Sequence, residues 1–479
     1  MSRLIGIENE YIGVKKNGDA MTRTDVVILW KKLAKAGWKS KIDTYNGELL
    51  GAYKKTKYGV ISIDNDGGAP LVEVSYPPYP DIHTTKKEQK KVISLLNKLI
   101  GKNNRLLGYG CAPFTNPKDV ALTPKCYYPD LLTIVNEYKH MQPFFMEGAT
   151  QINIGGTLKE LHKALNLFFR LDAILYALFA NTPIHKGKIS EYKDIRGKHY
   201  DNLKKGLNKT HRDLFCMNDR PFRSWKEYVV NLLDRPGRLL FAKNKFYRVL
   251  DKRKLFNIFT ERKQLKVREV KKTYFKNTKE KKAYKKHKLE QEIELDIHDT
   301  LLTQNVNWLD VRLRFSFKEN ASTEEYIKKL KGTAQNFEKF LEKNLDNQYI
   351  EIRPVSTQQP KDQMIAPAFC LGLIENMKKA QKLMERNSWK FWHKMRVQAY
   401  THAMDAKVGN VPIDKFFKPL YEIAYEGLKK RKKGEEIFLE PLKNNIENHV
   451  SPADMAKKIF KTKSKKEFLD SLTITPEKI

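Results

Sequence analysis

The chain has 479 residues, and its 91 Lys and Arg against 56 Asp and Glu give a formal net charge of +35. With 41% hydrophobic residues it can bury a large core, and its composition excludes collagen-like, disordered and membrane-embedded proteins. The longest apolar stretch, residues 164–180, contains Arg170 and Asp172 and is short for a bilayer span, so we interpret it as a buried helix and expect no membrane partner.

The excess of positive charge would suit a polyanion such as nucleic acid. Lysine is spread along much of the chain, however, and no zinc finger, RRM core or KH loop is visible. We therefore expect only non-specific binding of nucleic acid at low salt. The first residues are strand-like rather than a basic and apolar leader, and the four cysteines lack Cys-x-x-Cys spacing. Together these features predict a cytoplasmic protein without structural zinc.

Residues 1–155 are predicted to be mostly strands with one or two helices. Apolar residues recur at helical spacing in 25–37 and 87–100. A longer helix is predicted from about 157 to 180, because Pro183 disfavours helical geometry in the residue before it. Strands are predicted at 3–14, 58–64, 71–76 and 149–155.

Lysine is especially frequent in residues 186–290, and we interpret about 204–300 as a basic, mostly helical insertion. A charge run of this kind is typical of a solvated helical arm or a flexible segment. The alternative is a lid or a docking surface for an acidic substrate, and the sequence leaves both open.

The rest of the chain returns to a mixed pattern and then becomes helical. Strands are predicted at 308–317 and 348–355, around a helix at 323–343, and helices follow beyond residue 364. The fold class is therefore α+β. We expect a catalytic domain over residues 1–380, including the insertion, and a helical C-terminal region over 381–479.

Acidic residues recur inside strand-like runs. Glu8 and Glu10 lie two residues apart in Ile-Gly-Ile-Glu-Asn-Glu-Tyr, so a strand would direct both carboxylates to one face of its sheet. Glu73 lies in a second run that stops at a double proline, and Asp64 and Asp66 precede it in a Gly-rich turn. Alternating acidic and apolar residues usually mark a half-exposed strand. A carboxylate flanked by Ile and Val is unfavourable in a core unless it is paired or bound to metal, so the recurrence predicts a divalent-metal site.

A third strand, Tyr-Ile-Glu-Ile-Arg-Pro-Val, places Glu351 and Arg353 on one face. Arg353 could contact a phosphate or a carboxylate of the substrate or form an ion pair with Glu351, and both can hold at once. Arg196 is a candidate for binding a substrate carboxylate or phosphate, because a guanidinium matches both in bidentate geometry. Arg312 could do the same, or it could pair with Asp310 or Glu351.

Several short segments, in their order and spacing over about 370 residues, resemble the glutamate–cysteine ligase family and the wider carboxylate–amine ligases of the glutamine synthetase-like superfamily. The segments are Ile5-Gly6-Ile7-Glu8-Asn9-Glu10, Leu71-Val72-Glu73-Val74, Gly148-Ala149-Thr150-Gln151-Ile152-Asn153-Ile154, Ala180-Asn181-Thr182-Pro183 followed by Arg196, Trp308-Leu309-Asp310-Val311-Arg312, and Tyr349-Ile350-Glu351-Ile352-Arg353-Pro354-Val355 followed by Gln358-Gln359-Pro360.

The resemblance implies a curved, mainly antiparallel sheet with helices packed on it, which holds ATP and two or three Mg²⁺ ions. It implies a ligase that phosphorylates a carboxylate with ATP and then lets an amine attack the acyl phosphate. The expected substrates are the γ-carboxylate of glutamate and the amine of cysteine. Two alternatives stay open: a peptide- or protein-modifying amidoligase of the same fold that takes an acidic peptide, and a nucleic-acid-binding protein on an inactive ligase scaffold.

The resemblance also implies roles for individual residues. Gln151 and Asn153 alternate on a strand and would contact metal, nucleotide or substrate. Arg353 and Arg196 would act on the transferring phosphate or the activated carboxylate, and Arg312 would be a further nucleotide or substrate contact. The expected metal ligands are Glu8, Glu10, Glu73, Glu351 and, as a weaker one, Asp66.

Overall fold

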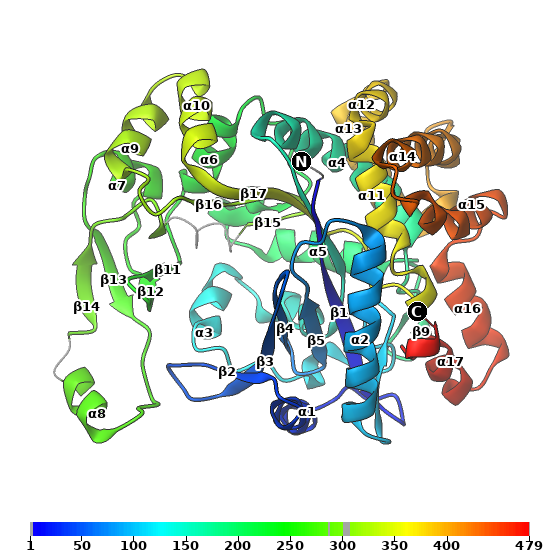
Figure 1. Ribbon diagram of the computed structural model, residues 1–479, viewed down its shortest axis with the longest axis horizontal. Coiled ribbons are helices and arrows are strands. Elements are labelled where there is room, and N and C mark those ends of the chain that lie inside the picture. The colour runs from blue at the N-terminus through cyan, green and yellow to red at the C-terminus, as the bar shows by residue number, and fades with distance from the viewer. Residues whose placement is uncertain (1–2, 286–287, 300–306, 479) are drawn as a thin grey trace.

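The computed structural model describes residues 3–285, 288–299 and 307–478 (Figure 1). Its central feature is a nine-stranded sheet among these residues, in which the paired strands are antiparallel. In sheet order the strands are β16 (Val311–Phe317), β17 (Leu345–Ile352), β7 (Thr150–Gly155), β1 (Ile5–Lys15), β5 (Leu71–Ser75), β4 (Gly59–Asn65), β3 (Leu49–Thr56) and β2 (Lys39–Ile42), while β6 (Asn104–Leu107) pairs with β1. This mixed architecture with a large antiparallel sheet confirms the α+β prediction.

Strand alternation gives the sheet two chemically different faces. Isoleucines at alternate positions of β1, β7 and β17 enter the main hydrophobic core: Ile5, Ile7, Ile152, Ile154, Ile350 and Ile352. Helix α4 (Leu158–Phe179) packs on β16 and β17 over this face, and α11 (Ile365–Glu375) packs on β1 and β7. A second cluster packs α1 (Arg23–Lys35) and α2 (Ile82–Ile100) on residues of β3, β4, β5 and β6. The residues between the isoleucines therefore lie on the opposite face.

The predicted elements correspond closely to β1, β4, β5, β7, β16, β17, α1, α2 and α4. The helix expected at 323–343 is two helices, α9 (Thr323–Lys331) and α10 (Ala334–Asn344), because the chain leaves helical geometry at Gly332 and Thr333 caps the second helix. Strands β2, β3 and β6 were not predicted. All four residues of β2 are exposed, so it has no apolar alternation to detect.

The basic insertion differs from the expectation. We expected it to be mostly helical, but it contains a four-stranded antiparallel sheet of β11 (Leu239–Ala242), β12 (Lys245–Val249), β13 (Leu265–Glu269) and β14 (Glu290–Ile293), with helices α6 (Trp225–Leu233), α7 (Leu255–Thr260) and α8 (Thr278–Lys285). Leu265 and Val267 are buried while Lys266 and Arg268 between them are exposed. This alternation is a strand signal, and the high lysine content of the segment concealed it.

Beyond residue 364 the chain is largely helical, as predicted, through α11, α12 (Met377–Met384), α13 (Trp389–His402), α14 (Phe417–Arg431), α15 (Glu440–Glu447), α16 (Pro452–Thr462) and α17 (Lys465–Leu472). Helices α11 and α14 cross closely at Gly372 and Gly427, where a Cβ atom on either would lie about 2 Å from a backbone oxygen of the other helix. Helix α13 packs on α4 in the main core. Among the described residues, no helix combines the length and hydrophobicity that a membrane crossing requires.

One buried cation joins the helices behind the sheet. Arg396 on α13 is 3% exposed, and its Nε lies 2.6 Å from Asp172 Oδ2 on α4 and 3.1 Å from Asp310 Oδ2. Its Nη1 lies 2.7 Å from Asp201 Oδ1, and Asp201 also accepts a hydrogen bond from Tyr400. Burial and the neighbouring Asp310 raise the pKa of Asp172 well above its ordinary value. The guanidinium therefore offsets the repulsion between buried carboxylates.

Replacing Arg396 by Leu should be strongly destabilising, because it leaves buried carboxylates without their cation. We expect a loss of about 3–5 kcal/mol in the free energy of unfolding, measured by denaturant titration. The matched change at the exposed Arg386, Arg386→Leu, should stay within about 0.5 kcal/mol. Equal stability of the two variants would contradict a central role for this network.

Candidate active site

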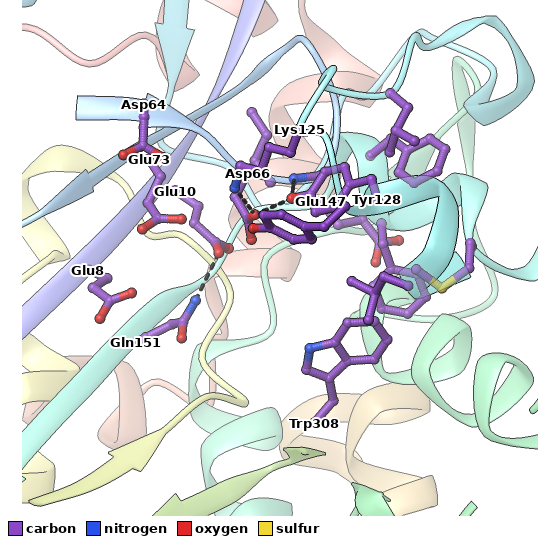
Figure 2. Close-up of a pocket in the computed structure, with 18 of the residues that line it drawn as sticks. Glu8, Glu10, Asp64, Asp66, Glu73, Lys125, Tyr128, Glu147, Gln151 and Trp308 are labelled. Atoms are coloured by element: carbon purple, nitrogen blue, oxygen red, sulfur yellow. Dashed lines mark hydrogen bonds and ion pairs between the residues drawn. The ribbon is translucent and has the colours of Figure 1, made fainter. Parts of the chain in front are cut away.

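The face of the sheet that carries the polar residues opens into a pocket of about 570 Å³ (Figure 2). Carboxylates from β1, β4 and β5 line one part of it, and arginines from β16, from the residue after β17 and from α5 (Ile195–Gly206) line another. The third part of the lining is mainly aromatic and aliphatic. It includes Tyr127, Tyr128, Phe144, Phe145, Phe241, Phe246 and Trp308.

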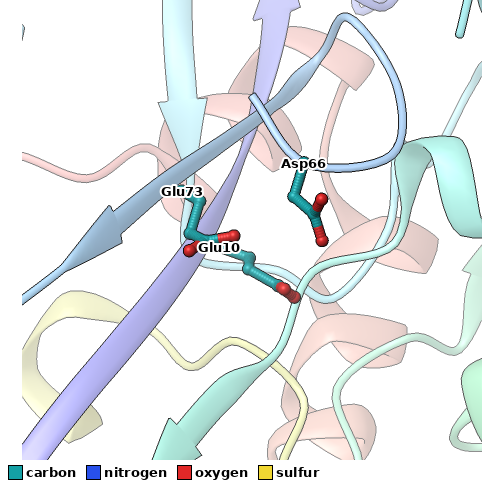
Figure 3. A group of neighbouring side chains, drawn as sticks. All are labelled: Glu10, Asp66 and Glu73. Carbon is teal, nitrogen blue, oxygen red and sulfur yellow. The ribbon is translucent and has the colours of Figure 1, made fainter. Parts of the chain in front are cut away.

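Three carboxylates meet in this pocket. Glu10 and Glu73 lie directly opposite each other on the antiparallel strands β1 and β5. Asp66 reaches the same point from the turn after β4, and one oxygen of each of the three groups lies within 4.8 Å of the others (Figure 3). Hard divalent cations prefer such oxygen ligands, so Glu10, Asp66 and Glu73 together form a candidate magnesium site.

Hydrogen bonds hold Glu10 and Glu73 in place. Glu10 accepts hydrogen bonds from Gln151 Nε2 at 2.8 Å and from the Ala149 amide at 2.7 Å. The Ser75 hydroxyl donates to Glu73 at 2.8 Å. Burial and the charge of Asp66 raise the pKa of Glu10 to about 7, and burial and the charge of Glu8 raise the pKa of Glu73 well above its ordinary value. Without a cation these two carboxyl groups therefore resist ionisation, as expected for a site that fits a divalent metal ion.

Asp66 is the anionic member of the cluster. Burial opposes its ionisation, but the ammonium of Lys125 at 2.8 Å outweighs burial and lowers the pKa of Asp66 below its ordinary range. The Tyr128 hydroxyl donates a second hydrogen bond at 2.6 Å. We expected Asp66 to be a weaker metal ligand, and the structure places its carboxylate in one group with those of Glu10 and Glu73.

Glu8 lines the same pocket as Glu10, as their spacing predicted. The Asn153 amide donates to it at 3.1 Å, and burial together with the charge of Glu351 raises its pKa. Asp64 also lines the pocket, where it accepts hydrogen bonds from Lys41 and Ser62.

Glu351 is surrounded by guanidinium groups. It pairs in bidentate fashion with Arg312, at 2.7 and 2.8 Å, and accepts a hydrogen bond from Arg353 Nη1 at 2.8 Å. Its side chain is 3% exposed, and Arg312 and Arg353 lower its pKa although burial opposes this. Of the alternatives for Arg312, the ion pair with Glu351 is present. Both oxygens of Glu351 are thus occupied, and its expected role as a metal ligand stays a prediction.

Arg353 connects this arginine cluster to the carboxylates. Its Nη1 donates both to Glu351 and to Gln151 Oε1, each at 2.8 Å, and the amide nitrogen of Gln151 donates in turn to Glu10. Gln151 therefore lies between the two charged clusters. Its amide nitrogen donates to the carboxylate of Glu10, and its amide oxygen accepts from the guanidinium of Arg353. Arg312 and Arg353 both line the pocket, so the cationic cluster faces the same space as the acidic one.

Arg196 also reaches the pocket, from the first turn of α5. Its Nη1 donates to the Ser356 hydroxyl at 3.0 Å, and Ser356 donates to Asp194 at 2.5 Å. Within the described part of the chain, its Nε has no hydrogen-bond partner. A buried guanidinium with an unused donor is suited to an anionic group of a ligand.

Several residues of the pocket were not found by sequence reasoning. Lys125 and Glu147 lie in loops and Tyr128 in the one-turn helix α3 (Tyr128–Leu131), so no periodicity marks them, and only the folded chain brings them to the sheet. Phe241 and Phe246 come from the β11–β12 hairpin of the basic insertion, and Phe246 stacks on Tyr127 with ring centroids 5.0 Å apart. The insertion therefore lines the pocket. Its described residues do not form the purely solvated arm that was one of the two alternatives from the sequence.

Residues 4–232 of the chain match the model of glutamate-cysteine ligase family 2, which confirms the resemblance seen in the sequence. No curated protein sequence matches the chain. A solved glutamate–cysteine ligase from Francisella tularensis, in complex with AMP, is similar over 98% of this chain and 88% of its own, with 13% identity and a TM-score of 0.56. A bifunctional glutathione synthetase from Pasteurella multocida is similar over 98% of this chain and 51% of its own, with 12% identity and a TM-score of 0.49. The match to the family model indicates a ligase of the carboxylate–amine type, and the similarity to the Francisella tularensis structure supports the fold alone.

The raised pKa of Glu10 predicts a link between pH and metal binding. A carboxyl group whose pKa is raised by folding stabilises the folded state while it is protonated, so this stabilisation is lost as the pH rises through about 7. Because Mg²⁺ requires the ionised form, it should raise the unfolding temperature more at about pH 8 than at about pH 5. Thermal unfolding with and without Mg²⁺ at both pH values measures this difference.

The Glu10→Gln variant should lose most of the magnesium response, since a neutral amide replaces one ligand. Glu48→Gln, at an exposed ion pair with Arg23, is the matched control and should retain it. A magnesium response that does not depend on pH would contradict the assignment of Glu10 to the metal site.

Proposed function

We propose that this chain, which matches glutamate-cysteine ligase family 2 over residues 4–232, is an ATP-dependent carboxylate–amine ligase. In this proposal a substrate carboxylate is phosphorylated by ATP, and an amine then displaces phosphate to form an amide. The proposed acid is glutamate, through its γ-carboxylate, and the proposed amine is that of cysteine. The catalytic unit comprises residues 1–380 with the basic insertion, and the helices of 381–479 support it.

The observation that carries the proposal is the placement of an acidic and a cationic cluster in one pocket. Phosphoryl transfer requires positioning and charge neutralisation more than covalent help from the protein. Glu10, Asp66 and Glu73 would hold Mg²⁺, with Glu8 as a further ligand beside them. When bound, Mg²⁺ would neutralise the charge of the ATP phosphates.

The arginines supply the second half of this arrangement. Arg353 is held by Glu351 and Gln151, so its guanidinium has a defined orientation next to the acidic cluster. We assign to Arg353 the stabilisation of the negative charge that develops on the transferring phosphate. A hydrogen-bond donor that is already oriented needs no reorganisation during the reaction. Arg196, with its unused Nε donor, would bind the carboxylate of the acid substrate or its acyl phosphate.

The direct test is to measure ADP and phosphate release by the purified protein. We expect full turnover only when an acid and an amine are both supplied, and a slower partial reaction with the acid alone. A mass-spectrometric panel of amino-acid and peptide pairs would identify the product. Mass shifts on acidic peptides rather than on free glutamate would favour the peptide-modifying alternative, and no turnover across the panel would refute the proposal.

Arg353→Lys should lower ligation strongly, because a point charge cannot replace the planar guanidinium that bridges Glu351 and Gln151. The loss of one such contact costs roughly 3 kcal/mol, about a hundredfold in rate. ADP release at saturating ATP measures it. Arg105→Lys, at an ion pair with Asp470 outside the pocket lining, is the matched control and should keep the wild-type rate.

Glu351→Gln tests whether Glu351 binds metal or positions arginines. We expect a large fall in rate with an unchanged magnesium requirement, because Arg312 and Arg353 already occupy both carboxylate oxygens. Measuring the rate over a magnesium titration separates the two roles. A shift of the half-saturating Mg²⁺ concentration would instead support the metal-ligand role that the sequence predicted.

A further inference from the structure

A buried carboxylate of the pocket takes no part in the acidic cluster. Glu147 lies just before β7 and lines the pocket, although its side chain is only 2% exposed (Figure 2). Its Oε1 is paired with Nδ1 of His199, which lies on α5 three residues after Arg196. Within the part of the chain that the structure describes, its Oε2 has no hydrogen-bond partner. A buried carboxylate oxygen without a donor is costly, so it is suited to a donor that arrives with the substrate.

The surroundings of Glu147 and His199 are well defined. The backbone of Cys111 pairs with that of Glu147, and the ring of His185 packs on that of His199 with centroids 5.3 Å apart. Burial and the charge of His199 lower the pKa of His185 to about 4, so His185 is neutral near pH 7. Asp194 and Arg196 also interact electrostatically with Glu147.

We propose that Glu147, oriented by His199, binds the ammonium group of the acceptor and removes its proton. This inference rests on the proposed ligase function. An ammonium cation has no lone pair and cannot attack an acyl phosphate, so the reaction needs a group that both attracts the cation and accepts a proton. Glu147 is suited to both because it is a carboxylate outside the group of Glu10, Asp66 and Glu73, lines the pocket, and has one buried oxygen without a hydrogen-bond partner among the described residues.

The proton balance of the step is simple. The ammonium gives one proton to Glu147, and the neutral amine forms a C–N bond at the acyl carbon. The bond from this carbon to the phosphate oxygen breaks, and phosphate leaves with the electron pair. The nitrogen then loses a second proton, which the leaving phosphate takes. After release of the amide, Glu147 returns its proton to solvent.

The test compares two nitrogen nucleophiles, the amine substrate and hydroxylamine, in the variant Glu147→Gln. The side-chain amide of Gln keeps a hydrogen-bond acceptor for His199 but cannot take a proton. With the amine substrate near neutral pH, the rate should fall by about a hundredfold or more, in the range of general-base catalysis. It should recover as the pH rises toward about 9, because more of the amine is then neutral in solution. With hydroxylamine, which is already neutral near neutral pH, the rate of hydroxamate formation should equal that of the wild type.

The hydroxylamine reaction also shows that the variant is folded and still activates the acid. Glu147→Asp, which keeps the base, should retain part of the amine reaction. If Glu147→Gln loses both reactions equally, or if its magnesium requirement shifts, Glu147 is structural or a metal ligand and the inference is wrong. If the wild type forms neither amide nor hydroxamate, the proposed ligase function fails as well.

Discussion

Mutual repulsion among the carboxylates of Glu10, Asp66 and Glu73 is the constraint on which the pocket depends. Strand pairing brings Glu10 and Glu73 opposite each other, and the turn after β4 adds Asp66. Burial makes the charges of Glu10 and Glu73 unfavourable, and their pKa values are raised as a result. A divalent cation bound between the three groups would relieve this cost. The hydrophobic cores behind the sheet hold the strands in the register that keeps these groups together.

In the cationic cluster the charges are reversed, and one carboxylate stabilises several guanidinium groups. Three arginines surround Glu351, and this single carboxylate lets them lie close together in a buried place. Gln151 separates the two clusters and is hydrogen-bonded to both, so neither collapses onto the other as a direct ion pair. A phosphate between them would meet metal on one side and guanidinium on the other. Similar requirements for charge neutralisation hold for phosphoryl transfer in general.

The basic insertion contributes shape rather than charge to the pocket. Its four-stranded sheet presents Phe241 and Phe246, and Phe246 stacks on Tyr127. The insertion is joined to the rest of the protein by polar contacts as well, since Tyr45, in the turn between β2 and β3, donates to Glu269 of β13 at 3.3 Å. Part of the space in which a substrate would lie is therefore built from the segment whose role the sequence left open.

The sequence by itself determined which side chains share a face, because strand periodicity depends only on neighbours along the chain. It predicted Glu8 beside Glu10 and Glu351 beside Arg353, together with six of the nine strands of the central sheet, its main helices and the family resemblance. Only the tertiary structure decided which contacts form between segments that are distant in the sequence. Strand register set Glu73 against Glu10, and loop closure brought Asp66 with Lys125 to the cluster and Glu147 to His199. Periodicity carries no information on register or loop path, which are set by long-range packing.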